Sequence, residues 1–232
     1  MSEESKNNQE ENIKENSDEI KSEAKNTFKD AKETMKTVNI KNDAKVTKGY
    51  VSGFLKDPLK SLSSIAKDSK NANFKNALLL VLILLIVVLL ESIFGVHWAK
   101  NLAGTNSLNI IKNLLEPIVG LIAISCIIYF MQKNSKKNLT TILTTIITSI
   151  IPYILAKFLT ILNLFSADFY RITSPILSFS LVFSNLLIYF SLKDLLGIEE
   201  DTKAVKKFVV LQVVYFIIYF IFTFLGIYIP EI

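Results

Sequence analysis

The chain has 232 residues, of which half are hydrophobic and a fifth are charged, and its net charge is +5. The two classes are segregated, because residues 1–76 hold 28 of the 47 charged side chains and only 21 apolar ones, whereas residues 77–232 are about three-fifths apolar. A soluble domain averages about 45–50% apolar residues, so the second block cannot cover a water-facing surface. This composition excludes a soluble enzyme and predicts a charged tail followed by an all-α domain embedded in a membrane.

The second block contains five apolar segments, each close to the ~20 residues that a helix needs to cross the hydrocarbon core of a bilayer. The predicted spans are residues 77–96, 109–131, 139–164, 174–193 and 207–229. Pro152 lies in the middle of the third span, where we expect it to kink the helix. The sequence thus predicts a polytopic integral membrane protein with five transmembrane helices.

The lysines in the short loops predict the orientation of these spans, because cytoplasmic loops carry an excess of Lys and Arg. The segment before the first span, the loop between spans two and three and the loop between spans four and five are all rich in lysine, and the other two loops are not. With five spans crossing the membrane in succession, these three segments lie on the same side of the membrane. We expect a multi-pass protein with a cytoplasmic N-terminus and a C-terminus outside, and the Lys-, Asn- and Ile-rich usage indicates a bacterial cell membrane.

Residues 1–56 are predicted to form a charged cytoplasmic tail. The first sixteen residues have almost nothing to bury, so we expect disorder there. Between about 17 and 39 the apolar residues follow a helical spacing: they are Ile20, Ala24, Phe28, Ala31, Met35 and Val38. Two interpretations remain open, a helix that binds a partner or the membrane surface, and a weak, solvated helix.

A second amphipathic segment covers residues 57–70, at the start of a predicted membrane domain over 57–232. Asp57 can cap a helix and Pro58 suits its first position. The apolar residues that follow share one face, and lysines occupy the others: the apolar set is Leu59, Leu62, Ile65 and Ala66. A short basic amphipathic helix beside a span is predicted to lie flat at the lipid headgroups.

Ionisable residues inside the spans are the candidate functional residues, because a charge in hydrocarbon is costly. Glu116 and Lys157 each lie about seven residues from the outer end of their span, at similar depth. We hypothesise an intramembrane ion pair between Glu116 and Lys157, with Glu91 as the alternative partner. The other interpretation is that Lys157 extends to the interface and that Glu116 caps a shorter helix starting at Pro117.

Residues that would support catalysis or a cofactor are scarce. His97 is the only histidine and Cys126 the only cysteine, so no disulfide and no cysteine-based zinc site can form within the chain. The sequence also contains no HExxH, GxSxG or Walker phosphate-binding motif. We therefore expect no enzyme, no cofactor and no metal. The small net charge also argues against nucleic acid as a partner, which leaves the lipid bilayer and proteins that contact the tail.

Three segments resemble the Yip family of five-span membrane proteins (Ypt-interacting proteins), in particular its prokaryotic relatives. They are the proline-initiated stretch Phe54–Leu62, the mid-helix proline in Ile150–Leu155, and Leu187–Ala204 with its aromatic helix end, its turn at Gly197 and its Lys203-Ala204 start of the last helix. The resemblance covers about residues 54–229.

The resemblance implies five spans, a cytoplasmic N-terminus and a non-enzymatic role as a membrane-organising or trafficking adaptor that acts through protein or lipid contacts. Eukaryotic relatives bind small GTPases of the Rab type, but this tail matches no such motif. The alternative function is a small transporter or permease component, with Glu116, Lys157 and Asn185 facing a polar cavity. The scattered polar positions and the odd number of spans argue against the related halves that are common in transporters.

Overall fold

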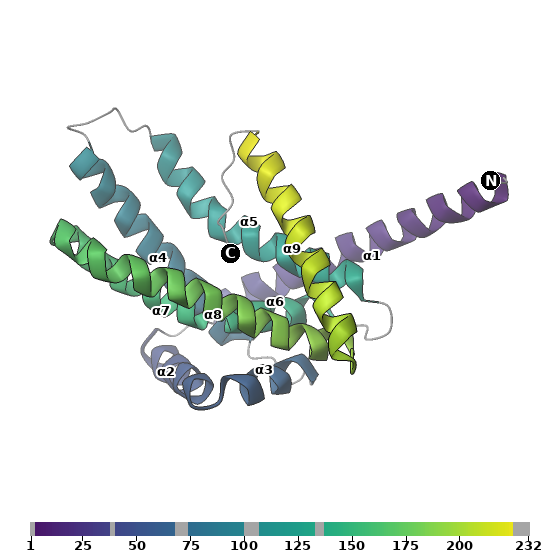
Figure 1. Cartoon of the computed structure of the whole chain (residues 1–232), viewed down its shortest axis with the longest axis horizontal. Coiled ribbons are helices and arrows are strands. Elements are labelled where there is room, and N and C mark those ends of the chain that lie inside the picture. The colour runs from purple at the N-terminus through teal and green to yellow at the C-terminus, as the bar shows by residue number, and fades with distance from the viewer. Residues whose placement is uncertain (1–2, 38–39, 68–73, 100–106, 133–136, 225–232) are drawn as a thin grey trace.

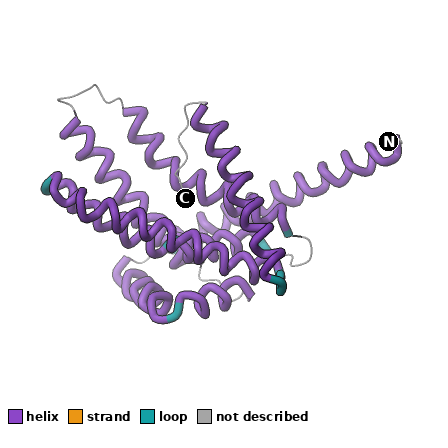
Figure 2. The backbone as a smooth tube through the Cα atoms, in the orientation of Figure 1, coloured by secondary structure: helices purple, strands orange, loops and turns teal. Residues whose placement is uncertain are grey.

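The structure, a computed structural model, describes residues 3–37, 40–67, 74–99, 107–132 and 137–224. These residues are helical apart from short turns, and there is no strand among them (Figure 2). The all-α prediction is therefore confirmed for the described chain.

Four of the described helices are long and apolar enough to cross a membrane. They are α4 (Phe74–Ala99), α5 (Ser107–Met131), α8 (Tyr170–Leu196) and α9 (Asp201–Phe224). Each overlaps a predicted span and extends past at least one of its predicted limits. The end of the fifth predicted span, residues 225–229, lies outside the described residues.

The third predicted span is broken in two. It consists of α6 (Leu139–Ser149) and α7 (Ile151–Leu159), which continues into the 3-10 helix η2 (Thr160–Leu164). The two halves are bent by 46° at the break, and the chain has up to five spans if this pair counts as one. The predicted kink at Pro152 is confirmed, because Pro152 occupies the first turn of α7 and Ile150 separates the two helices.

Residues on both sides of the break between α6 and α7 explain it. Pro152 has no amide hydrogen to donate to the carbonyl four residues earlier, which belongs to Thr148. On the other side, hydroxyls of the threonine-rich α6 donate to the carbonyls one turn back, which bends helices. These bonds run from Thr144 to Thr140, Thr145 to Thr141, Thr148 to Thr144 and Ser149 to Thr145, at 2.7–2.9 Å.

Three helices precede the membrane-length helices: α1 (Glu3–Lys36), α2 (Ile40–Lys56) and α3 (Pro58–Lys67). Figure 1 shows α2 and α3 at one end of the bundle and α1 extending away from it. The structure continues α1 back to Glu3, where disorder was expected for residues 1–16. The composition accounts for this longer helix, because Glu, Gln and Lys are good helix formers and Glu10 precedes Lys14 at the favourable i,i+4 spacing.

Helix α3 forms within the predicted segment 57–70, of which residues 68–70 lie outside the described residues, and the Lys60 amide donates to the Asp57 carboxylate at 3.0 Å. Its apolar face, however, packs on protein. Leu62, Ile65 and Ala66 are buried, and the helix contacts α6 and α8. The residues that were expected to meet lipid headgroups therefore attach α3 to the bundle, and of this apolar set Leu59 remains exposed.

A single apolar core joins α2 and α3 to the membrane-length helices. Phe54 is only 2% exposed and belongs to the same cluster as Leu84, Ile128, Ile142 and Leu192. The packed unit therefore begins at least three residues before the predicted domain boundary at residue 57.

Candidate functional site

The strongest candidate site is an ion pair inside the bundle. The Lys157 ammonium on α7 lies 2.7 Å from the Glu91 carboxylate on α4, and the two side chains are only 20% and 23% exposed. The structure thus pairs Lys157 with the alternative partner that the sequence offered. Because both charges are mostly removed from solvent, each depends on the other for compensation.

Glu116 lies at the same site without joining the pair. Its carboxylate is close enough to interact electrostatically with Lys157, but none of the ion pairs within 4 Å between described residues includes it. The interpretation in which Glu116 caps a helix starting at Pro117 was wrong, since α5 begins at Ser107 and continues through Pro117. Pro117 leaves the carbonyl of Asn113 without its helical donor, which adds a polar group at this depth.

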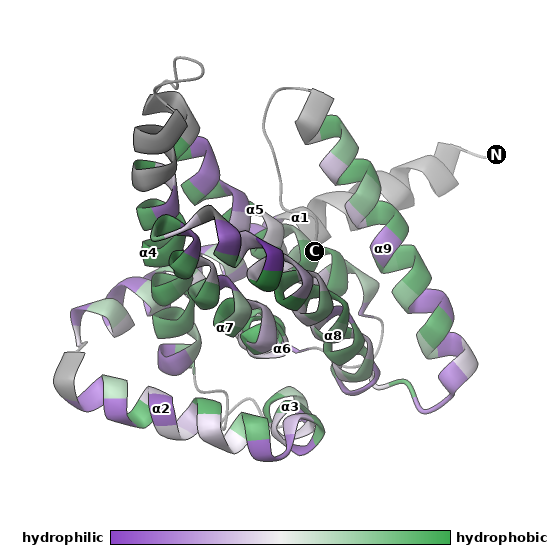
Figure 3. Cartoon of the chain, turned by 60° about the vertical axis from the view of Figure 1, so that its left-hand side comes forward, coloured by the Kyte–Doolittle hydropathy of each residue, from purple (hydrophilic) through white to green (hydrophobic). Residues whose placement is uncertain are grey.

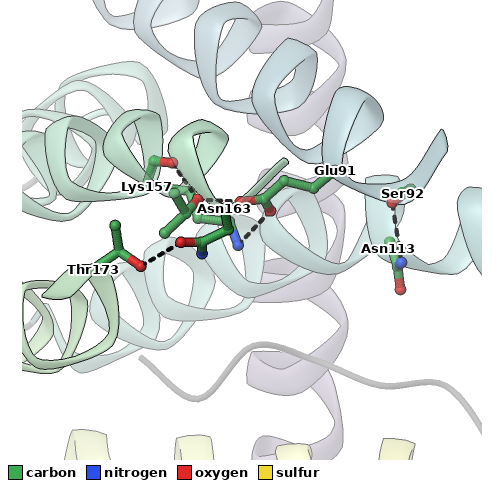
Figure 4. A network of polar contacts seen from close by, with 7 residues as sticks. Glu91, Ser92, Asn113, Lys157, Asn163 and Thr173 are labelled. Carbon is green, nitrogen blue, oxygen red and sulfur yellow. Dashed lines mark hydrogen bonds and ion pairs between the residues drawn. The ribbon is translucent and has the colours of Figure 1, made fainter. Parts of the chain in front are cut away.

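Neutral polar side chains extend the site across four elements (Figure 4). The Thr160 hydroxyl in η2 contacts the Glu91 carboxylate and also the Lys157 carbonyl. The Asn113 amide on α5 donates to the Ser92 hydroxyl on α4 at 3.1 Å.

A further bond joins the segment after α7 to α8, where the Thr173 hydroxyl donates to the Asn163 side-chain oxygen at 2.8 Å. Sequence reasoning missed Ser92, Asn113, Thr160, Asn163 and Thr173, because neutral polar residues are common near span ends. The one available signal was the adjacent Glu91-Ser92 pair that directly follows a long apolar run.

The ion pair, Glu116 and the Ser92–Asn113 bond border a cavity of about 270 Å³, whereas Thr160, Asn163 and Thr173 are not part of its lining. Its lining consists of Leu84, Val88, Glu91, Ser92, Asn113, Glu116, Pro117, Tyr153 and Lys157. Ligand pockets typically measure about 300–1,000 Å³, so this volume suits water molecules or a small cation better than an organic substrate. The lining contains two acidic side chains, Glu91 and Glu116, and one basic side chain, Lys157.

Some of the remaining polar residues of the spans join helices, since the Tyr50 and Thr148 hydroxyls lie 2.5 Å apart between α2 and α6 and the Ser149 and Ser191 hydroxyls lie 3.1 Å apart between α6 and α8. Thr141, Thr144, Thr145 and Thr148 are all buried in α6, and the hydroxyls of the last three donate to carbonyls one turn back. Elsewhere, the Gln212 amide on α9 donates to the Asn185 side-chain oxygen on α8 at 3.2 Å. Asn185 is thus separate from the cavity lined by Glu116 and Lys157.

A second feature lies where α1 meets the bundle. The Leu139 amide at the start of α6 donates to the Glu23 carboxylate at 3.1 Å, and the Thr27 and Thr140 hydroxyls lie 3.2 Å apart. A carboxylate at a helix N-terminus also interacts favourably with the helix dipole. Polar residues therefore dock α1, and the predicted apolar stripe is left largely outside this contact.

The stripe itself faces outward. Phe28 is 74% exposed and Met35 is 42% exposed, Ala24 is exposed and Ala31 is partly buried. Ile20 and Val38 lie outside the described side chains, as does His97. Among the described residues, no group of three or more His, Cys, Asp or Glu side chains could hold a metal ion.

Compared with protein-family models, curated proteins and solved structures, the chain matches none of them.

Proposed function

We propose that the protein is a non-enzymatic, multi-pass membrane protein of the Yip type, a membrane-organising or trafficking adaptor that acts through protein or lipid contacts. The observation that carries this proposal is the apolar stripe of α1, defined by Ala24, Phe28, Ala31 and Met35. It is exposed on a helix that the bundle holds in place, with Phe28 at 74%. Exposed apolar patches are a feature of interaction sites.

The charges around the stripe support the same function. Exposed lysines lie on the side of α1 that adjoins Phe28, namely Lys21, Lys25, Lys29, Lys32 and Lys36. The acidic Glu23 lies on the docked side. A helix with an apolar stripe beside a basic side suits an anionic lipid surface or an acidic protein partner.

For the membrane domain we propose five spans, with α6 and α7 forming one. A bend of 46° is far from the reversal that a re-entrant loop needs, so the pair continues toward the other side of the membrane. With five spans, the lysine-rich segments lie in the cytoplasm and the C-terminus lies outside, in a bacterial cell membrane.

A transporter or permease component is the second candidate, and the cavity beside Lys157 favours it. The ion pair with Glu91 weakens this alternative, since Lys157 is already occupied within the protein. The purified protein in liposomes would support this function if it carried protons or small cations and if Lys157→Met abolished the flux.

Site-specific crosslinking tests the adaptor function. A photoactivatable amino acid at position 28 of the full-length chain is expected to give discrete adducts with a protein or with lipid in cells. The matched control is the same amino acid at Glu33, which is exposed on another side of α1. Equal adducts from both positions, or none from position 28, would contradict a role for the stripe. Removal of residues 1–37, which leaves α2 and its core residue Phe54 in place, would then show whether any partner instead contacts the membrane domain.

A further inference from the structure

A large apolar groove runs between α2, α4 and α7, away from the polar cavity. Its volume is about 850 Å³, within the range of about 300–1,000 Å³ typical of ligand sites. Leu55 of α2, Ile83 and Ile86 of α4 and Phe158 of α7 are among its lining residues. All four are exposed, from 38% for Ile83 to 56% for Leu55, so the core of the protein does not fill the groove.

The groove is apolar over most of its length and basic beside α2. Lys48 and Lys56 line it there, and both are exposed. Neither has a carboxylate within 4 Å among the described residues. The nearby Asp43 is neutralised by Lys75 at 2.8 Å. The α2 side of the groove therefore carries a net positive charge.

The apolar wall continues into the membrane. Leu79 and Ile86 both line the groove and are seven residues apart on α4, which corresponds to about 10 Å along the helix axis. Figure 3 shows α2 crossing below the apolar α4, near the end at which α4 begins. An occupant must therefore combine an anionic group near α2 with an apolar chain along α4 and α7.

We propose that this groove binds an anionic phospholipid, with its headgroup at Lys48 and Lys56 and an acyl chain along α4 and α7. The walls on α4 and α7 belong to helices that contact lipid in a membrane, so a lipid reaches the groove by lateral diffusion. Each lysine near an anionic group contributes about a fivefold gain in affinity. This site is separate from the α1 stripe and does not depend on the adaptor function.

Fluorescence quenching by brominated lipid provides the test. The reporter is the full-length protein with Trp98→Phe and Phe158→Trp, which places its only tryptophan at the groove. It is reconstituted in bilayers of unlabelled phosphatidylcholine that contain small mole fractions of brominated phosphatidylglycerol or brominated phosphatidylcholine. We expect saturable quenching by the anionic lipid at mole fractions where the zwitterionic lipid has little effect. Equal quenching by the two lipids would mean ordinary annular contact and would overturn the proposal.

Charge variants of the reporter separate a built site from a general attraction. Lys48→Gln with Lys56→Gln is expected to lower the affinity for the anionic lipid roughly thirtyfold, because the fivefold contributions of the two lysines multiply. Lys60→Gln with Lys206→Gln removes the same charge from exposed positions outside the groove and is expected to change the affinity less than twofold. Lys48→Arg with Lys56→Arg should retain binding. An equal loss in the Lys60 and Lys206 variant, or no loss in the Lys48 and Lys56 variant, would overturn the proposal, and circular dichroism with gel filtration verifies that every variant is folded.

Discussion

At the scale of single residues, the pair formed by Glu91 and Lys157 is the most consequential contact inside the bundle. It joins α4 to α7 with both side chains less than a quarter exposed, so its two charges compensate each other and neither has an easy substitute. Thr160 strengthens the arrangement, since its hydroxyl contacts the same carboxylate. Removing one partner alone should therefore lower the free energy of unfolding more than removing both.

A double-mutant cycle tests this pairing. Lys157→Met leaves the Glu91 carboxylate without compensation and should lower the free energy of unfolding by about 3 kcal/mol. Glu91→Gln combined with Lys157→Met should be less destabilised than the sum of the single variants. The measurement is reversible unfolding of the purified protein in detergent.

The control for this cycle is Glu116→Gln, which alters the neighbouring carboxylate outside the ion pair. The coupling free energy between Glu116→Gln and Lys157→Met should be smaller than that between Glu91→Gln and Lys157→Met. A stronger coupling for Glu116 than for Glu91 would restore the pair first hypothesised from the sequence.

Gly197 ends α8 in the left-handed region, at φ 62° and ψ 40°. The amide of Ile198 donates to the Lys193 carbonyl at 2.9 Å, which closes this helix end. Gly197→Ala should lower the free energy of unfolding by about 1–2 kcal/mol, because an L side chain is strained there. Gly197→Asn should lower the free energy of unfolding by less, and the two variants can be compared by thermal unfolding. Equal losses would indicate that the backbone conformation is not the cause.

At the scale of elements, the position of α1 depends on polar contacts with the N-terminus of α6. Glu23→Ala removes the acceptor of the Leu139 amide and should weaken docking by about 1 kcal/mol. Amide hydrogen exchange in residues 23–34 should then be about fivefold faster. Glu33→Ala, at an exposed position of the same helix, is the control. If both variants accelerate exchange equally, helix propensity and not docking sets the protection of α1.

The elements themselves could be predicted because long apolar runs and proline act locally. The membrane-length helices overlap the predicted spans, and the break before Pro152 is where the sequence indicated it. Which surface each helix face contacts could not be predicted, because the packing of neighbouring helices determines it. Leu62 and Ile65 look suited to lipid, yet α6 and α8 cover them.

The same limit explains the outcome at the candidate site. Equal depth placed Glu116 and Lys157 together along the membrane normal, but depth does not fix rotation about a helix axis. The packing of α4 against α7 decides that Glu91 is the closer partner. The docking of α1 through Glu23 and Thr27 was also beyond sequence reasoning, since apolar residues were expected to form that contact.

At the scale of the whole molecule, the bend between α6 and α7 determines the topology. If the pair crosses the membrane, the segment η3 (Ala167–Phe169) lies on the side opposite to α2, and if it returns, both lie on the same side. Cysteine labelling in cells separates these cases in a Cys126→Ser background, which removes the only native thiol. Lys45→Cys and Asp168→Cys place single thiols at exposed positions of α2 and η3.

With five spans and a cytoplasmic α2, a membrane-impermeant maleimide should label Asp168→Cys in intact cells and Lys45→Cys only after permeabilisation. The expectation follows from the bend, because 46° changes the direction of the chain too little to return it to its starting side, and from the positive-inside rule, because α2 carries several lysines. Protection of both thiols in intact cells would indicate a re-entrant α6–α7 pair and four spans. Labelling of Lys45→Cys alone would mean that the bundle has the opposite orientation.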